Sequence, residues 1–205
     1  MGWRRSTPRS SGSTSTARHC PGSQGAQQNY KRFGAEPRDH AIGRSRGGLT
    51  TKNHLVCDGK GRALAFLLTP GQSADTSWMQ ATLAEIRVRG AAGRPRTRPD
   101  RVMADKGYPS RSNRAWLRER GIAATIPERD DQIAHRRKKR GRPIDFGDDQ
   151  KARYRGRNVV ERCFGKLKQW RGIAMRSDKL ARNYHAALCL AATLHWLTSG
   201  ISNTP

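Results

Sequence analysis

Four polar residues with reactive or charged side chains recur at helical spacing in the last third of the chain. Tyr154, Arg157, Glu161 and Lys168 are separated by three, four and seven residues. At about 100° per residue, a helix places all four within a stripe roughly 60° wide. The stripe presents an aromatic hydroxyl, two cations and one carboxylate. An ordinary surface helix is the alternative, with an Arg157–Glu161 ion pair worth about 0.3–0.5 kcal/mol.

The rest of this segment predicts how the stripe is positioned. A helix over residues 150–171 would pack its other side on a core through apolar residues, which are Val159, Val160, Cys163, Leu167 and Trp170. A last helix is expected over residues 181–197. It is apolar on nearly every face and too short to span a bilayer, so buried packing is expected.

Upstream, strand and turn signals alternate with helix signals. Residues 49–57 and 63–69 read as strands joined by an Asp-Gly turn at 58–61, which predicts a hairpin. A short helix capped by Asp75 or Ser77 and an Arg/Pro/Gly linker over 90–99 follow. A strand over 101–105 ends in the carboxylate of Asp105. A helix from Ser110 to Gly121 and a strand over 122–126 complete a βαβ unit with parallel pairing.

The charge balance of the chain points to a polyanionic partner. It holds 41 Lys and Arg against 16 Asp and Glu, for a net charge of +25, and nucleic acid is the default partner at such a charge. No apolar run suits a transmembrane helix or a secretory signal. The four cysteines lack CxxC spacing and no Walker A motif is present, which argues against a zinc site and a nucleotide site.

The stripe and its neighbours carry a resemblance to a known family. Tyr-x2-Arg-x3-Glu-x6-Lys resembles the signature of DDE transposases of bacterial insertion sequences. Three further segments resemble the sequences of this family: 43–52, 104–108 (Ala-Asp-Lys-Gly-Tyr) and 157–164. The resemblance covers about residues 36–198.

The resemblance implies an α/β fold with an RNase H-like mixed sheet flanked by helices. It implies catalytic, metal-ligating roles for Asp105 and Glu161, and two Mg²⁺ or Mn²⁺ ions in an intact family member. DNA contacts are expected from two groups: Tyr154, Arg157 and Lys168 of the stripe, and the basic run Arg136, Arg137, Lys138, Lys139 and Arg140 in a predicted exposed loop over 130–149.

The chain departs from the family pattern at its N-terminus. The first catalytic Asp and its strand are expected upstream of residue 43, and no Asp precedes Asp39. Residues 1–41 are instead predicted to be a disordered, basic, Ser/Gly-rich tail. The partial catalytic domain is expected over 42–198 and a second tail over 199–205. Two explanations for the absent first Asp are open: a shifted or truncated gene start, and translational frameshifting. The candidates to replace it as a metal ligand are Asp39, Asp58 and Asp75.

The resemblance therefore implies a transposase that cuts and joins DNA ends by metal-dependent phosphoryl transfer, and the missing Asp predicts that this chain is poorly active alone. The expected substrate is duplex DNA at the terminal inverted repeats, in the cytoplasm of a bacterium on its nucleoid, with no membrane partner. A homo-oligomer or association with an intact transposase is left open. Two alternatives remain: a non-catalytic basic DNA-binding regulator, and an RNA-binding protein of ribosomal type, which accounts for the charge but not for the stripe.

Overall fold

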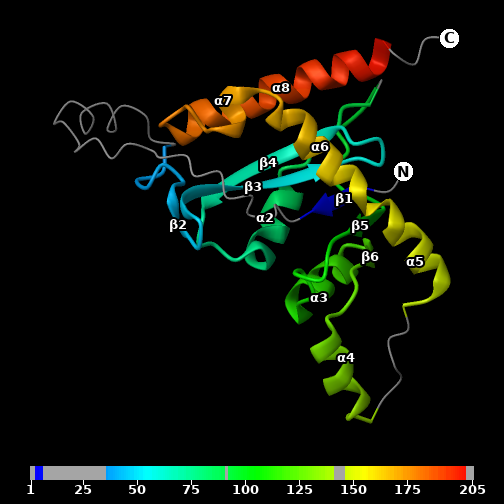
Figure 1. The fold of residues 1–205 in the computed structure, drawn as a ribbon. Coiled ribbons are helices and arrows are strands. Elements are labelled where there is room, and N and C mark those ends of the chain that lie inside the picture. The colour runs from blue at the N-terminus through cyan, green and yellow to red at the C-terminus, as the bar shows by residue number, and fades with distance from the viewer. Residues whose placement is uncertain (1–2, 7–35, 91, 141–145, 202–205) are drawn as a thin grey trace. The chain divides into compact units, whose positions relative to one another are not determined.

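The computed structural model describes residues 3–6, 36–90, 92–140 and 146–201. The chain forms two compact units, drawn together in Figure 1. Unit 1 comprises Met1–Thr7, His54–Phe66 and Ala74–Phe164, and unit 2 comprises Pro8–Asn53, Leu67–Ser73 and Gly165–Pro205.

Unit 1 is built on a mixed sheet. Its first strand, β1 (Trp3–Ser6), pairs antiparallel with the end of β3 (Gly48–Cys57) and parallel with β5 (Arg101–Met103). β6 (Ala123–Thr125) pairs parallel with β5. β4 (Ala63–Pro70) pairs with β3, so the predicted hairpin is confirmed.

β1 differs from the sequence-based expectation. It lies inside the segment predicted to be disordered, and no strand was expected before residue 42. A strand in the middle of a sheet is held by backbone hydrogen bonds on both edges, which need no apolar side chains. Hydropathy therefore gives no signal for it. The prediction for residues 7–35 lies outside the described residues and stays a prediction.

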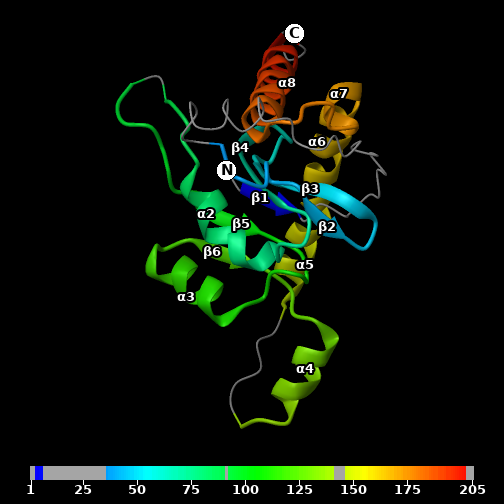
Figure 2. The ribbon, with the colours of Figure 1, turned by 90° about the vertical axis from the view of Figure 1, so that its left-hand side faces the viewer.

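One face of this sheet carries α2 (Met79–Ala84) and α3 (Arg111–Glu119), as Figure 2 shows. These helices and the sheet share one apolar cluster, which includes Met79, Leu83, Ile86, Val102, Leu117 and Ile122. The predicted start and end of α3 are confirmed. The hydroxyl of Ser110 accepts the Asn113 N–H at 3.1 Å, and Gly121 follows the helix at φ 63°. The predicted cap before α2 is wrong, since the 3₁₀ turn η1 (Asp75–Trp78) precedes it and neither element has a side-chain cap.

The segment 130–149 is not the exposed loop that was predicted. It begins with the helix α4 (Asp130–Arg137), which buries none of its residues. Two acidic residues in its first turn and three basic ones in its last complement the helix dipole, so charge supports this helix without an apolar stripe. Hydrophobic periodicity could not reveal it. Residues 141–145 lie outside the described part of the chain.

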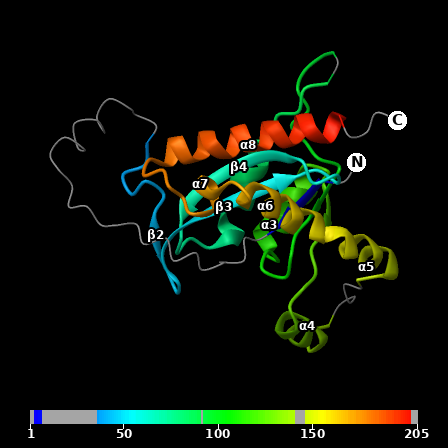
Figure 3. The ribbon, with the colours of Figure 1, turned by 45° about the horizontal axis from the view of Figure 1, so that its top comes forward.

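The single helix predicted over 150–171 is divided into shorter elements. α5 (Asp148–Arg155) is followed by the 3₁₀ turn η2 (Gly156–Asn158) and by α6 (Val159–Lys168); Figure 3 shows α5 and α6 in succession. Glycine has low helix propensity, and Gly156 marks the break. Val159, Val160, Cys163 and Leu167 are buried as expected. Trp170 is not, because it lies beyond α6 with 52% of its surface exposed.

Unit 2 contains β2 (Gly43–Ser45), which pairs antiparallel with the first residues of β3, and the helices α7 (Arg171–Ala174) and α8 (Ala181–Ile201). The prediction of a fully buried last helix holds for one side of α8, where Tyr184 and Leu188 are buried. The other side exposes Leu190 and Leu197 at 63% and 59%. Among the described residues, no helix is both long and apolar enough to cross a membrane.

Candidate nucleic-acid processing site

Asp105 lies two residues beyond Met103, the last residue of the central strand β5. The Ala104 N–H bonds to the Thr125 carbonyl at 3.3 Å, which continues the β5–β6 pairing up to this point. The carboxylate of Asp105 accepts the Gly107 N–H at 2.9 Å. Tyr108 is completely buried and anchors the turn in the core. The turn therefore fixes Asp105, half-buried, at the end of the strand.

Glu161 lies in the first turn of α6 and is exposed. Among the described residues, its carboxylate has no hydrogen-bond or ion-pair partner. The Arg157–Glu161 pair of an ordinary surface helix is absent from this part of the chain. Instead, Arg157 donates to the Tyr154 hydroxyl at 2.6 Å, and its guanidinium lies 4.9 Å from the centre of that ring. Because η2 intervenes, the four polar residues do not follow one uniform helical stripe.

Asp105 and Glu161 are both carried by elements that adjoin β1. β5, which leads into Asp105, pairs with β1, and η2, which leads into the helix of Glu161, contacts β1. The parallel register pairs Trp3 with Val102 and Arg4 with Met103. Continued by two residues, this register places Ser6 level with Asp105. The strand Trp-Arg-Arg-Ser holds no carboxylate.

The predicted DNA-contacting residues lie at three places: in α5 and η2, at the end of α6, and at the end of α4. Tyr154 and Arg157 form a contacting pair, and the ring of Phe146 packs edge-to-face against the ring of Tyr154, with 5.8 Å between the ring centres. Lys168 is exposed at the last position of α6. The basic run begins on the last turn of α4, where Arg136 is bound to the Glu128 carboxylate. The next four residues, Arg137, Lys138, Lys139 and Arg140, are exposed.

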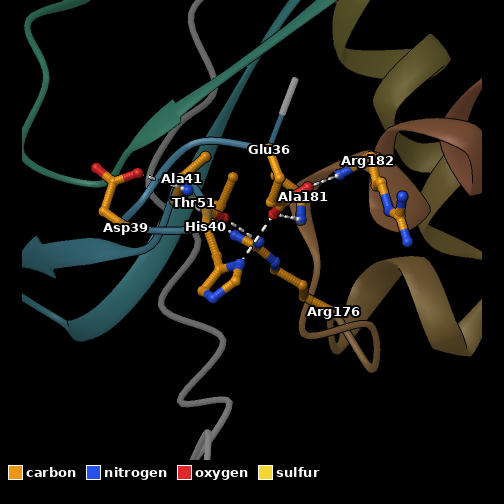
Figure 4. A network of polar contacts seen from close by, with 8 residues as sticks. All are labelled: Glu36, Asp39, His40, Ala41, Thr51, Arg176, Ala181 and Arg182. Carbon is orange, nitrogen blue, oxygen red and sulfur yellow. Dashed lines mark hydrogen bonds and ion pairs between the residues drawn. The ribbon is translucent and has the colours of Figure 1, made fainter. Parts of the chain in front are cut away.

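The three candidate replacement carboxylates are each engaged locally. Asp39 accepts the Ala41 N–H at 2.9 Å (Figure 4). Asp58 binds two backbone N–H groups of its own turn and the guanidinium of Arg62 at 2.6 Å. Asp75 lies 3.9 Å from the ring of the buried His54. Within the described ranges, no three His, Cys, Asp or Glu side chains gather in a way that could hold a metal ion.

A buried carboxylate that sequence reasoning missed lies in unit 2. Glu36, with 2% of its side chain exposed, is bound by the His40 ring at 2.9 Å. It also accepts the backbone N–H groups of Ala181 and Arg182 at 2.7 and 3.1 Å, at the start of α8 (Figure 4). Burial alone raises the pKa of Glu36, but hydrogen bonds from His40 and from the two amides outweigh it and hold the pKa below 4.5. This is a structural carboxylate, and its backbone partners at the start of α8 lie too far along the sequence to give a local signal.

Comparison with known proteins identifies the family. The family model described as "Transposase DDE domain" matches residues 14–196. A protein of Burkholderia cepacia named as a transposase for insertion sequence element IS402 is 33% identical over 145 residues, 70% of this chain and 61% of that protein. A Brucella ovis protein named as a transposase for insertion sequence element IS6501 is 29% identical over 150 residues, 73% of this chain and 99% of its own length. The chain thus spans less than two thirds of the first of these relatives.

No solved structure matches significantly. The match of the family model covers most of the chain, including both Asp105 and Glu161. The chain belongs to the DDE transposases of insertion sequences.

Proposed function

We propose that this chain binds duplex DNA and presents Asp105 and Glu161 as two of the carboxylates of a DDE phosphoryl-transfer site. The observation that supports this most is that Glu161 has no partner in the described part of the chain while its helix begins close to the strand next to β5. Glu161 is exposed and has no partner among the described residues. Within these ranges, both oxygens of this carboxylate are therefore open to a ligand. Its helix follows a turn that contacts β1, and β1 is the neighbour of β5, the strand that leads to Asp105.

The arrangement of strands supports an RNase H-like sheet. A β3–β4 hairpin lies on one side of β1, and the parallel strands β5 and β6 lie on the other. In such a sheet the first strand carries one carboxylate, and Asp105 follows the neighbouring strand. Side chains at the carboxyl ends of adjacent parallel strands are close enough to share a ligand.

The family uses divalent metal ions. Asp105 and Glu161 suit such ions in ligand type, but they are two carboxylates where the family has three. Carboxylate oxygens are the ligands that Mg²⁺ prefers. Asp105 has one oxygen bound to Gly107 N–H, and Glu161 has both available. When bound, two such ions activate the attacking oxygen and stabilise the leaving oxygen of an in-line displacement. Two carboxylates without a third are too few to hold both ions, so we propose that the chain alone is catalytically poor.

The polyanion in this proposal is DNA at the ends of a mobile element. Arginine forms bidentate hydrogen bonds with phosphate, and the chain carries a net charge of +25. Within the basic run, Arg137–Arg140 are exposed while Arg136 is occupied by Glu128. We therefore assign phosphate contacts to the last four residues of the run, and Tyr154 with Arg157 to the binding or orientation of a DNA end.

A cleavage assay with the chain and labelled duplex DNA tests the proposal. In Mg²⁺ or Mn²⁺ the 205-residue chain is expected to bind DNA in a salt-sensitive way without cutting it. A chain extended or altered so that the first strand carries an Asp should cut. In that active form, Asp105→Ala and Glu161→Ala should each abolish cleavage and leave binding intact. Robust cleavage by the unaltered chain, or activity that survives both substitutions, contradicts the assignment.

We propose a second function, regulation of an intact transposase, which also rests on DNA binding. A chain that binds DNA but cuts poorly would compete with an intact transposase for the element's ends, as a regulator. The exposed side of α8, with Leu190 and Leu197, supports association with another copy or with an intact relative. Inhibition of an active family member by an excess of this chain, with no inhibition by a variant that does not bind DNA, would establish this role.

A further inference from the structure

Residues 87–90 and 92–101 form the two sides of an arginine-rich arm, most of which (90–99) was predicted to be only a linker. The arm holds six arginines and one acidic residue, Asp100. Its two sides are joined as antiparallel backbone at Val88 and Arg96, through N–H to carbonyl bonds of 2.9 and 2.7 Å. Gly93, at φ 86°, adopts a left-handed conformation that allows the chain to reverse. Figure 2 shows the arm projecting away from α2 and α3 of its own unit.

The base of the arm is fixed to the core of unit 1. Ile86, immediately before the arm, is completely buried, and Val88 packs against the same apolar cluster. On the returning side Pro99 is buried, and its ring restricts the backbone. The arm therefore leaves the domain from a rigid base, which limits the conformational entropy lost when its tip binds a ligand.

The arginines divide into those that hold the base and those that do not. The guanidinium groups of Arg87 and Arg98 donate to the carbonyls of Ala84 (2.5 Å) and Arg120 (3.1 Å). Arg96 is paired with the carboxylate of Asp100. Arg89 and Arg94, on either side of the turn, are exposed and have no hydrogen-bond or ion-pair partner in the described part of the chain.

The charge at the tip is uncompensated. No acidic residue occurs between Glu85 and Asp100, and Asp100 is already occupied by Arg96. Placing Arg89 and Arg94 together on a turn costs electrostatic free energy in the free protein, since like charges repel. A bound phosphate backbone removes that cost, because each arginine can form a bidentate pair with a phosphate.

We propose that this arm is a second DNA-binding element, in which Arg89 and Arg94 contact phosphates of duplex DNA. A two-stranded ribbon fits the major groove, which is about 12 Å wide, and is too broad for the minor groove of about 6 Å. The contacts are made to the backbone, so they strengthen binding to any duplex. The inference rests on the proposed function in one respect, that the chain binds duplex DNA.

The test compares two charge-matched double variants of the full chain. Arg89→Ala/Arg94→Ala removes the tip cations, and Arg111→Ala/Arg118→Ala removes two exposed cations from α3. Binding to a 30-base-pair duplex of arbitrary sequence is measured by fluorescence anisotropy between low and moderate salt. Each phosphate contact contributes about 0.9 to the slope of log K against log salt. Loss of two contacts should lower that slope by about 1.8 and raise Kd at 0.1 M salt about 60-fold.

The control variant is expected to keep the wild-type slope, and Arg89→Lys/Arg94→Lys is expected to keep most of it because the charge remains. Equal losses in both alanine variants would overturn the inference, because they would show a response to net charge alone. An unchanged slope in the tip variant would also overturn it. Absence of duplex DNA binding by the wild-type chain would overturn the proposed function and, with it, the inference about the arm. All four substituted side chains are exposed, and an unchanged thermal unfolding midpoint confirms that each variant is folded.

Discussion

Glu36 in unit 2 and Glu161 in unit 1 are both glutamates at the N-terminal end of a helix, and the fold uses them differently. Glu36 comes from a distant part of the chain and caps α8 with two backbone hydrogen bonds, while the His40 ring binds the same carboxylate. Glu161 belongs to its own helix, α6, is exposed and has no partner among the described residues. The helix dipole favours a negative charge at both places. What separates the two is whether hydrogen-bond capacity is left for a ligand.

The surroundings of Glu36 show how strongly its position is fixed. His40 and Ala41 adopt positive φ values of 53° and 52°, which cost free energy in residues other than glycine. Their carbonyls accept hydrogen bonds from the guanidinium of Arg176 at 2.5 and 3.1 Å. The Thr51 hydroxyl also donates to the Ala41 carbonyl. The network in Figure 4 therefore stabilises a strained turn, whereas no such network surrounds Glu161 within the described ranges.

The largest expected effect is the loss of this cap. Glu36→Ala leaves two partly buried amides at the start of α8 and one imidazole without their acceptor, and should lower the free energy of unfolding by about 3 kcal/mol. Asp39→Ala is the matched control, since Asp39 lies in the same turn but is exposed and accepts one hydrogen bond. It should cost about 1 kcal/mol or less. Urea unfolding followed by circular dichroism measures both, and equal losses would remove the distinction between them.

The response to acid should be smaller and should depend on the same carboxylate. The pKa of Glu36 is held below its ordinary value of 4.5, so its charge stabilises the folded state above that pH. The stabilisation is lost as pH falls through the lowered pKa. Glu36→Gln should therefore be less stable than wild type at neutral pH and should lose less stability between pH 5 and pH 3. Parallel pH profiles for the two proteins would show that Glu36 does not contribute.

The smallest effect on stability is expected at the proposed site. Glu161→Gln removes no contact in the described structure, and Asp105→Asn retains an acceptor for the Gly107 N–H. Each should change the free energy of unfolding by about 0.5 kcal/mol or less. A loss of about 2 kcal/mol from Glu161→Gln would mean that this carboxylate serves the fold, as Glu36 does.

The sequence predicted the parts of the fold whose signals are local. The Asp-Gly turn, the Ser110 cap and Gly121 gave the hairpin and the βαβ unit, because turns and caps are specified by neighbouring residues. The strand β1, the Glu36 cap and the arm at 87–101 were missed. Each depends on partners far along the chain or on backbone pairing that hydropathy does not record. Glu36 and Ala181, for example, are separated by 145 positions.

For the candidate site, the resemblance singled out Asp105 and Glu161, and their joint use remains a prediction. The structure shows β1 paired in parallel with β5, the strand that leads to Asp105, so a carboxylate added to β1 tests the proposed site. Continued by two residues, the β1–β5 register places Ser6 level with Asp105 and Arg5 level with Ala104. A carboxylate introduced at Ser6 is therefore distinguishable from one introduced at Arg5.

Metal binding by the chain tests the central claim most directly, and electron paramagnetic resonance of Mn²⁺ measures it without any need for catalysis. We predict weak binding by the wild-type chain, further weakened by Asp105→Asn or Glu161→Gln, and at least about tenfold tighter binding by Ser6→Asp, because a third carboxylate completes the site. Arg5→Asp, the matched control, should leave the affinity near that of wild type. Binding by wild type as tight as by Ser6→Asp, and insensitive to Asp105→Asn and Glu161→Gln, would contradict the account.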